Sequence, residues 1–272
     1  MSMMLNRRQA LSLGLGSIAT LGLAACGGGS SDSGSADTAD GGKTYTIATD
    51  TVFAPFEFTD ESGTYVGIDI ELLAAVAADQ GFEYELNPVG FDAALQNVQS
   101  GQADGVIAGM SITDERKKVF DFSAPYFDST VCAAALATSP VASLDDLKDQ
   151  KVAVKNGTQS ALWAESLAEQ YGFTTTIFDD SATMYQDVTA GNTVACFEDT
   201  PVMSYAISTG NVEFKIIADC GADSEFATPY GFAVNKGENA ELLAAFDAGL
   251  ANIKANGTYE KIVSTYVQSV AE

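Results

Sequence analysis

The sequence predicts an α/β fold of two similar lobes joined by a two-stranded hinge. From residue 44 onward, strand-like and helix-like segments alternate, a pattern typical of a mostly parallel sheet with right-handed crossovers. The same alternation begins a second time at residue 151. Two extended, β-prone stretches, 123–137 and 228–237, lie far apart in the sequence, so the chain can cross twice between the lobes.

The first lobe begins with a βαβαβ unit. A strand is followed by a helix whose apolar positions, including Leu73 and Val76, recur at helical spacing until Gly81 ends it. A second strand, a short helix and a buried strand come next. The five expected elements of this unit are 44–49, 67–81, 83–86, 92–101 and 105–109.

The second lobe repeats this order, and the chain then returns to the first lobe. The repeat comprises 151–155, 160–172, 174–178, 183–191 and 193–197, where strands and helices again alternate. Two closing helices are expected at 240–257 and 258–270. We therefore assign 44–127 and 230–272 to the first lobe and 128–229 to the second.

The N-terminal region has the features of an export signal followed by a tether. Arg7 and Arg8 precede an apolar run that is too short for a comfortable membrane span. The run ends in "LAAC", which resembles the lipobox of bacterial lipoproteins and implies removal of residues 1–25 and lipidation of Cys26. Residues 26–43 are rich in Gly, Ser and Asp, as flexible tethers are. The alternative is a plain secretory signal with an incidental cysteine.

Composition excludes several classes of partner and cofactor. The formal net charge of −24 repels nucleic acid and anionic membrane surfaces, so membrane attachment is expected through the Cys26 lipid alone. The chain has no histidine and no CxxC motif, and we therefore expect no metal site and no cofactor. With Cys26 lipidated, three cysteines remain, so at most one pair can form. Cys196 with Cys220 is the candidate, because both lie at ends of expected strands.

The candidate ligand-binding residues lie where expected strands end. Ligands of open α/β sheets bind beyond the carboxyl ends of the strands, and two facing lobes bring several such ends around one cleft. These positions are Asp50 and Phe53, Phe91, Ala108 to Ser111, Lys155 to Gln159, and Glu198 with Asp199.

The chemistry of these side chains suits a zwitterion. Arg116 follows a strand end by a few residues, and its guanidinium can hold a carboxylate by two parallel hydrogen bonds. Asp199 can accept from an ammonium, and Phe53 and Phe91 offer flat apolar walls. The same residues also fit ordinary structural roles: a solvated helix start for Arg116, a helix N-cap for Asp199 and core packing for both rings.

Seven motifs occur in the order seen in substrate-binding proteins of polar amino-acid ABC transporters, and the chain most resembles the glutamine-binding proteins. The resemblance covers residues 44–268 and implies a type II periplasmic-binding fold that closes on one free L-amino acid. The motifs are "ATDTVFAPFEF", "YVGIDIELLAAVA", "AGMSITDERKKVFDFSAPYF", "VAVKNGTQS", "FEDTP", "YGFAVNKG" and "ANGTYEKI".

The resemblance also implies a role for each site residue. Arg116 binds the ligand α-carboxylate with help from Gly109, Ser111 and Thr158, and Asp199 takes the α-ammonium. The rings sandwich the side chain, whose polar end Asp50 reaches. The full candidate set is Asp50, Phe53, Phe91, Ala108, Gly109, Ser111, Arg116, Lys155, Thr158, Gln159, Glu198 and Asp199.

Two positions depart from the glutamine-binding pattern and leave the ligand open. Glu198 stands where that pattern has histidine, and Gln159 instead resembles the lysine/arginine/ornithine binders, whereas Lys155 matches the glutamine type. Glutamine is the expected ligand and a cationic amino acid the alternative. The expected protein is a non-enzymatic, monomeric receptor, lipid-anchored outside the cytoplasm, that serves an ABC permease. Two further candidate functions are a prephenate- or arogenate-type dehydratase, with Glu198 as general acid, and a sensor ectodomain.

Overall fold

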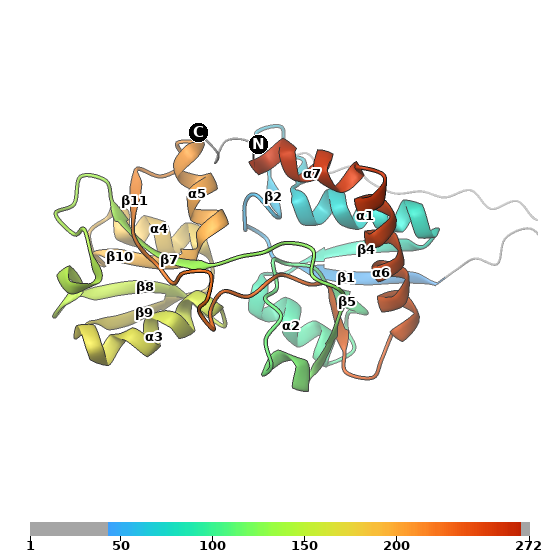
Figure 1. The fold of residues 1–272 in the computed structure, drawn as a ribbon, viewed down its shortest axis with the longest axis horizontal. Helices are drawn as coiled ribbons and strands as arrows, with labels where there is room; N and C mark the ends of the chain where they lie inside the picture. The colour runs from blue at the N-terminus through green and yellow to red at the C-terminus, as the bar shows by residue number, and fades with distance from the viewer. Residues whose placement is uncertain (1–42, 268–272) are drawn as a thin grey trace, which may run out of the picture. The chain divides into compact units, whose positions relative to one another are not determined.

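The computed structural model describes residues 43–267, which belong to one compact unit containing two five-stranded sheets (Figure 1). We call the elements around the first sheet lobe 1 and those around the second sheet lobe 2. The α/β class predicted from the sequence is confirmed. The predictions for the signal, the Cys26 lipid and the tether concern residues outside the described range. None of the helices within residues 43–267 is long and apolar enough to cross a membrane.

Lobe 1 is assembled from the two ends of the described chain. Its sheet has the order β4-β1-β5-β12-β6, in which β4, β1 and β5 are parallel and β12 runs antiparallel to both of its neighbours. A separate two-stranded sheet, β2-β3, follows β1. The elements are β1 (Thr44–Thr49), β2 (Phe58–Thr59), β3 (Tyr65–Val66), α1 (Ile68–Gln80), β4 (Glu83–Pro88), α2 (Phe91–Gln99), β5 (Gly105–Val106), η1 (Arg116–Lys118), β6 (Phe120–Phe122), β12 (Ala233–Asn235), α6 (Ala240–Ala255) and α7 (Thr258–Val267).

Lobe 2 comes from the middle of the chain and has the sheet order β11-β7-β10-β8-β9. Strands β10, β8 and β9 are parallel, whereas β7 is antiparallel to both β10 and β11. The elements are β7 (Val131–Leu136), η2 (Leu144–Leu147), β8 (Lys151–Lys155), α3 (Gln159–Tyr171), β9 (Thr174–Phe178), α4 (Ser181–Thr189), β10 (Ala195–Asp199), α5 (Thr200–Ser208) and β11 (Phe214–Asp219).

Each sheet has an apolar cluster on both faces, because successive strand residues point to opposite sides. In lobe 1, Ile47 packs into the cluster that includes α1, α6 and α7, while its neighbour Ala48 packs with α2. In lobe 2, one cluster packs with α3 and the other with α4. Both sheets are therefore covered by helices, and only the ends of the strands remain for a site.

Two segments cross between the lobes and lie side by side (Figure 1). The first runs from β6 to β7 and the second from β11 to β12. Tyr230 of the second segment forms isolated bridges with Phe127 of the first and with Ser111. The expected extended stretches at 123–137 and 228–237 therefore contain 123–130 of the first crossing and 228–232 of the second, and the rest of each stretch includes β7 or β12.

The expected disulfide does not form in this structure. Cys132, Cys196 and Cys220 are free thiols. Cys196 packs in the cluster on the α4 face of the second sheet, whereas Cys220 packs against the cluster on the α3 face. The pairing of Cys196 with Cys220 was wrong because a sheet separates the two side chains.

Candidate ligand-binding site

Eleven of the twelve predicted site residues line one cavity at the junction of the lobes. The cavity is narrow, with a volume of about 10 Å³, because side chains from both lobes reach across it. Strand ends supply most of the lining, as expected for open α/β sheets. The lining residues are Asp50, Phe53, Phe91, Ala108, Gly109, Ser111, Arg116, Lys155, Thr158, Gln159 and Asp199.

Lys155 reaches across the cavity from lobe 2 to lobe 1. It ends β8, and its Nζ pairs with the carboxylate of Asp50 just beyond β1; both side chains are 1% exposed. The Nζ lies 4.9 Å from the ring centre of Phe53 and 5.6 Å from that of Phe91, so the cation sits between the two aromatic rings. Burial lowers the pKa of Lys155, but the nearby carboxylates, Asp50 first, outweigh this and raise the pKa above its usual value.

Arg116 is held by backbone carbonyls of both lobes. One terminal nitrogen donates to the carbonyl of Ser111 at 2.9 Å and the other to the carbonyl of Gly157 at 3.0 Å. Its guanidinium carbon lies 5.3 Å from the ring centre of Phe91. Burial lowers the pKa of Arg116 to about 10, and the carboxylate of Asp199 opposes that shift. A guanidinium has five N–H donors, so donors remain for a ligand carboxylate.

Gly109 lines the cavity and also has a structural role. Its φ is +52°, and an added Cβ would lie 2.3 Å from the Phe53 ring, so glycine is required by both conformation and space. Its N–H donates to Asp69 at 2.7 Å. Thr158 caps α3: its hydroxyl accepts from the N–H of Ala161 at 3.1 Å and donates to the carbonyl of Lys155.

Glu198 is the one predicted site residue that the cavity excludes. Its carboxylate accepts from the hydroxyls of Ser181 at 2.6 Å and Tyr185 at 2.9 Å, both on α4. It also accepts from the N–H of Asp199. Glu198 therefore attaches α4 to the end of β10, and its remaining effect on the cavity is electrostatic.

Asp199 faces the cavity and accepts a hydrogen bond from Tyr230. Burial raises the pKa of Asp199 to about 7, with a further contribution from Glu198, while Tyr230, Lys155 and Arg116 oppose the shift. Tyr230 was missed by sequence reasoning, although it begins the motif "YGFAVNKG". The sequence predicts a crossing at this motif but no site role for its tyrosine, and in the structure Tyr230 links the crossing to the carboxylate of Asp199 in lobe 2.

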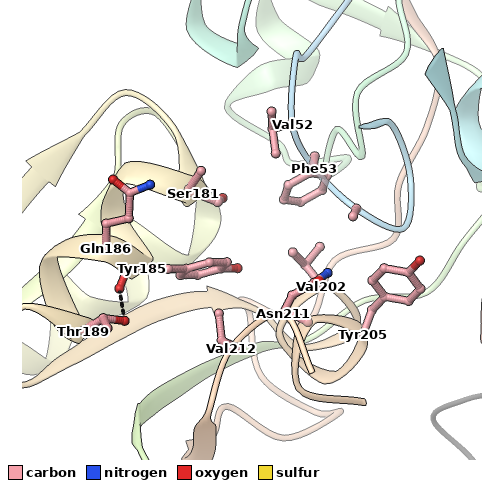
Figure 2. A pocket seen from close by; sticks show the side chains of 13 residues that line it. Val52, Phe53, Ser181, Tyr185, Gln186, Thr189, Val202, Tyr205, Asn211 and Val212 are labelled. Atoms are coloured by element: carbon pink, nitrogen blue, oxygen red, sulfur yellow. Dashed lines mark hydrogen bonds between the residues drawn. The ribbon is translucent and has the colours of Figure 1, made fainter. Parts of the chain in front are cut away.

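A second cavity, of about 300 Å³, lies beside the first and shares Phe53 with it (Figure 2). Val52 and Ala54 belong to the lobe 1 side, and α4 and α5 form the lobe 2 side. Figure 2 shows the Tyr185 ring along this cavity, next to Ser181. Both of these residues also donate to Glu198, so the network behind the first cavity forms part of the wall of the second.

The chain belongs to the bacterial extracellular solute-binding proteins, family 3, whose model matches residues 45–269. A "probable histidine-binding protein" of Neisseria gonorrhoeae is 31% identical, covering 90% of this chain and 91% of that protein. The open-conformation structure of substrate-binding domain 2 of Lactococcus lactis GlnP is 44% identical with a TM-score of 0.56, covering 83% and 95% of the two chains. An ancestral arginine-binding protein, solved with arginine and also with glutamine, is 37% identical with a TM-score of 0.74. The match covers 82% of this chain and 97% of that one.

Three buried acids make the fold less stable as the pH rises. The folded pKa values of Glu57, Asp69 and Asp199 lie above those of the unfolded chain, because burial penalises their charged forms. The folded protein therefore holds more protons than the unfolded chain between about pH 4 and 7, and stability falls through that range.

We expect the melting temperature to be several degrees higher at about pH 5 than at about pH 8. Scanning calorimetry across this range measures the effect. Asp199→Asn cannot ionise, and its melting temperature should change less with pH than that of the wild type. A melting temperature that rises steadily toward pH 8 contradicts the direction assigned to these groups.

Proposed function

We propose that this protein is an extracytoplasmic receptor that binds a free polar L-amino acid, glutamine in preference to others, between its lobes and delivers it to an ABC permease. Family membership supports the receptor class. The buried Lys155–Asp50 pair between Phe53 and Phe91 is the observation that carries the choice of glutamine. In this proposal the Cys26 lipid holds the monomeric receptor at the membrane.

A side-chain amide complements this pair. Its carbonyl oxygen can accept from Lys155, and its NH2 group can donate to Asp50. A cationic side chain in the same position would meet the ammonium of Lys155 at close range, which disfavours it. The main-chain groups have matching partners: Arg116 and the Thr158 turn for the carboxylate, and Asp199 for the ammonium.

A cationic ligand is the second candidate, and the relatives named for histidine and arginine favour it. Two residues that depart from the glutamine-binding pattern suggested it from the sequence. Gln159 lines the cavity. Glu198, by contrast, is fully buried and already accepts from Ser181 and Tyr185. Glu198 does not line the cavity, and a general acid must reach its substrate, so this position also weakens the dehydratase alternative.

Ligand binding should close the lobes. The cavity is lined from both lobes, and its small volume leaves no room for an amino acid in this arrangement of the lobes. A ligand that touches both lobes favours the closed arrangement over an open one. The lower TM-score of the open GlnP domain, despite its higher identity, fits a difference in lobe arrangement.

Calorimetry against the twenty amino acids and ornithine tests the ligand. The purified protein is first unfolded and refolded to remove carried-over ligand. We expect one-to-one binding with glutamine tightest and with arginine and lysine at least about tenfold weaker, a difference of about 1.4 kcal/mol. If arginine or lysine binds more tightly than glutamine, the ligand belongs to the cationic class. If none of these amino acids binds, the receptor proposal is wrong.

Arg116→Ala should weaken glutamine binding by about 2–5 kcal/mol, as truncation of one partner of a buried charge pair does. Titration calorimetry measures this loss. Lys117→Ala is the matched control, because Lys117 is the next residue and its side chain is 53% exposed and pairs with the exposed Asp114. The control should stay within about 0.5 kcal/mol of the wild type. Equal affinity in both variants contradicts the carboxylate role of Arg116.

Lys155→Met should change selectivity. It removes the donor to the amide carbonyl and leaves Asp50 unpaired, so glutamine should bind about 1.5–3 kcal/mol more weakly while arginine binds more tightly. Competition between labelled glutamine and unlabelled arginine measures the ratio. Lys151→Met is the control, since Lys151 begins the same strand and is exposed. An unchanged ratio in Lys155→Met means that Lys155 does not select the side chain.

A further inference from the structure

Two buried carboxyl groups lie directly behind the wall of the ligand cavity. Glu57 and Asp69 are each 0% exposed. Asp69 begins the first turn of α1, and its Oδ2 accepts from the N–H of Gly109 at 2.7 Å and from the hydroxyl of Tyr126 at 2.8 Å. Both oxygens of Glu57 and Oδ1 of Asp69 are buried and receive no hydrogen bond from any donor group among residues 43–267.

The N–H of Asp69 donates to the carbonyl of Phe56 at 2.9 Å, which brings Asp69 next to Glu57, the residue that follows Phe56. Their two carboxyl groups lie close enough to interact through a hydrogen bond. Two ionised carboxylates can only accept, so they cannot bond to each other and would repel in the core. A single proton removes both problems, because a protonated carboxyl donates to a carboxylate. Shared protons between adjacent carboxyl groups are a general solution to this conflict.

The surrounding charges place that proton on Glu57. Burial first, then the charges of Asp69 and Asp50, raise the pKa of Glu57 well above its usual value, and Lys155 only partly opposes them. Burial raises the pKa of Asp69 to about 6, but the bonds from Gly109 and Tyr126 stabilise its charged form. Tyr65 and Tyr126 are the other titratable groups near Glu57, and the pKa of each is raised, which keeps them neutral.

We infer that Glu57 is a protonated carboxylic acid that donates to Asp69, and that this pair positions the Ala108–Gly109 peptide in the wall of the ligand cavity. Asp69 then stays ionised and retains the N–H of Gly109. In a trans peptide the C=O points opposite to the N–H, so the carbonyl of Ala108 is turned away from Asp69. Since Ala108 and Gly109 both line the cavity, the carbonyl of Ala108 gives the cavity wall a hydrogen-bond acceptor beside Gly109.

An acceptor here suits the ammonium end of a ligand. This consequence rests on the proposed function, because only an amino acid brings an α-ammonium into the cavity. Glu57 and Asp69 touch no ligand themselves and act as positioning residues. The state of the pair itself is independent of what the cavity binds.

Infrared and NMR spectra of the purified protein without added ligand test the pair first. At pH 7, the carbonyl stretch of a protonated acid should be present in the wild type and reduced in Glu57→Gln. The Gly109 amide resonance should stay near its wild-type position in Glu57→Gln, whose amide still donates to Asp69, and should shift in Glu57→Leu, which has no donor. An unchanged acid band in Glu57→Gln, or an unshifted Gly109 amide in Glu57→Leu, overturns the inference.

Titration with glutamine then tests the effect on the cavity. Glu57→Leu should bind about tenfold more weakly than the wild type, the effect of losing about one hydrogen bond to a charged group, and Glu57→Gln should recover most of that loss. Glu61→Gln is the control, because Glu61 is an exposed acid four residues away. Equal affinities of Glu57→Leu and the wild type overturn the positioning role. If the wild type does not bind glutamine but the spectra behave as expected, the proposed ligand fails and the protonated pair stands.

Discussion

Lys155 and Asp50 form a buried ion pair that joins the two lobes, and the other polar groups of the cavity are arranged around it. Removing two charges from water is costly, and the cost is offset only when each charge keeps its partner. This pair forms only while the strand ends that carry it, of β8 and β1, face each other. Arg116 of lobe 1 and Asp199 of lobe 2 are a second pair of opposite charges, and they also meet only in this arrangement of the lobes. This arrangement of the lobes therefore pairs charges that belong to different lobes.

The location of the site could be predicted from the sequence because the carboxyl ends of parallel strands meet at one edge of a sheet. Asp50, Lys155 and Asp199 follow or end such strands, and the structure brings them to one cavity. Glu198 could not also point there. It precedes Asp199 in β10, and neighbouring residues of a strand point to opposite faces. That alternation is visible in the sequence and predicts that only one of the two side chains faces the cavity.

Some of the elements that sequence reasoning missed lack a periodic pattern of their own. The β2-β3 pair contains two residues in each strand, which is too short for a recognisable alternation. Tyr230 acts through its place in the second crossing, next to Phe127 and Ser111, and that register depends on how the lobes pack. The disulfide prediction failed for a related reason, since spacing along the chain does not say which face of a sheet a cysteine occupies.

The polar groups of the cavity are already paired within the protein, and this determines how a ligand can be selected. Asp50 has Lys155, Asp199 has Tyr230, and Arg116 has two backbone carbonyls. A ligand must replace these contacts with ones of equal or better geometry, so its affinity is a difference between two sets of hydrogen bonds. Under the proposed function, a molecule that offers a carboxylate, an ammonium and an amide would restore every partner. One that lacks any of these groups would leave a buried polar atom unpaired, and a site of this kind would reject such molecules strongly.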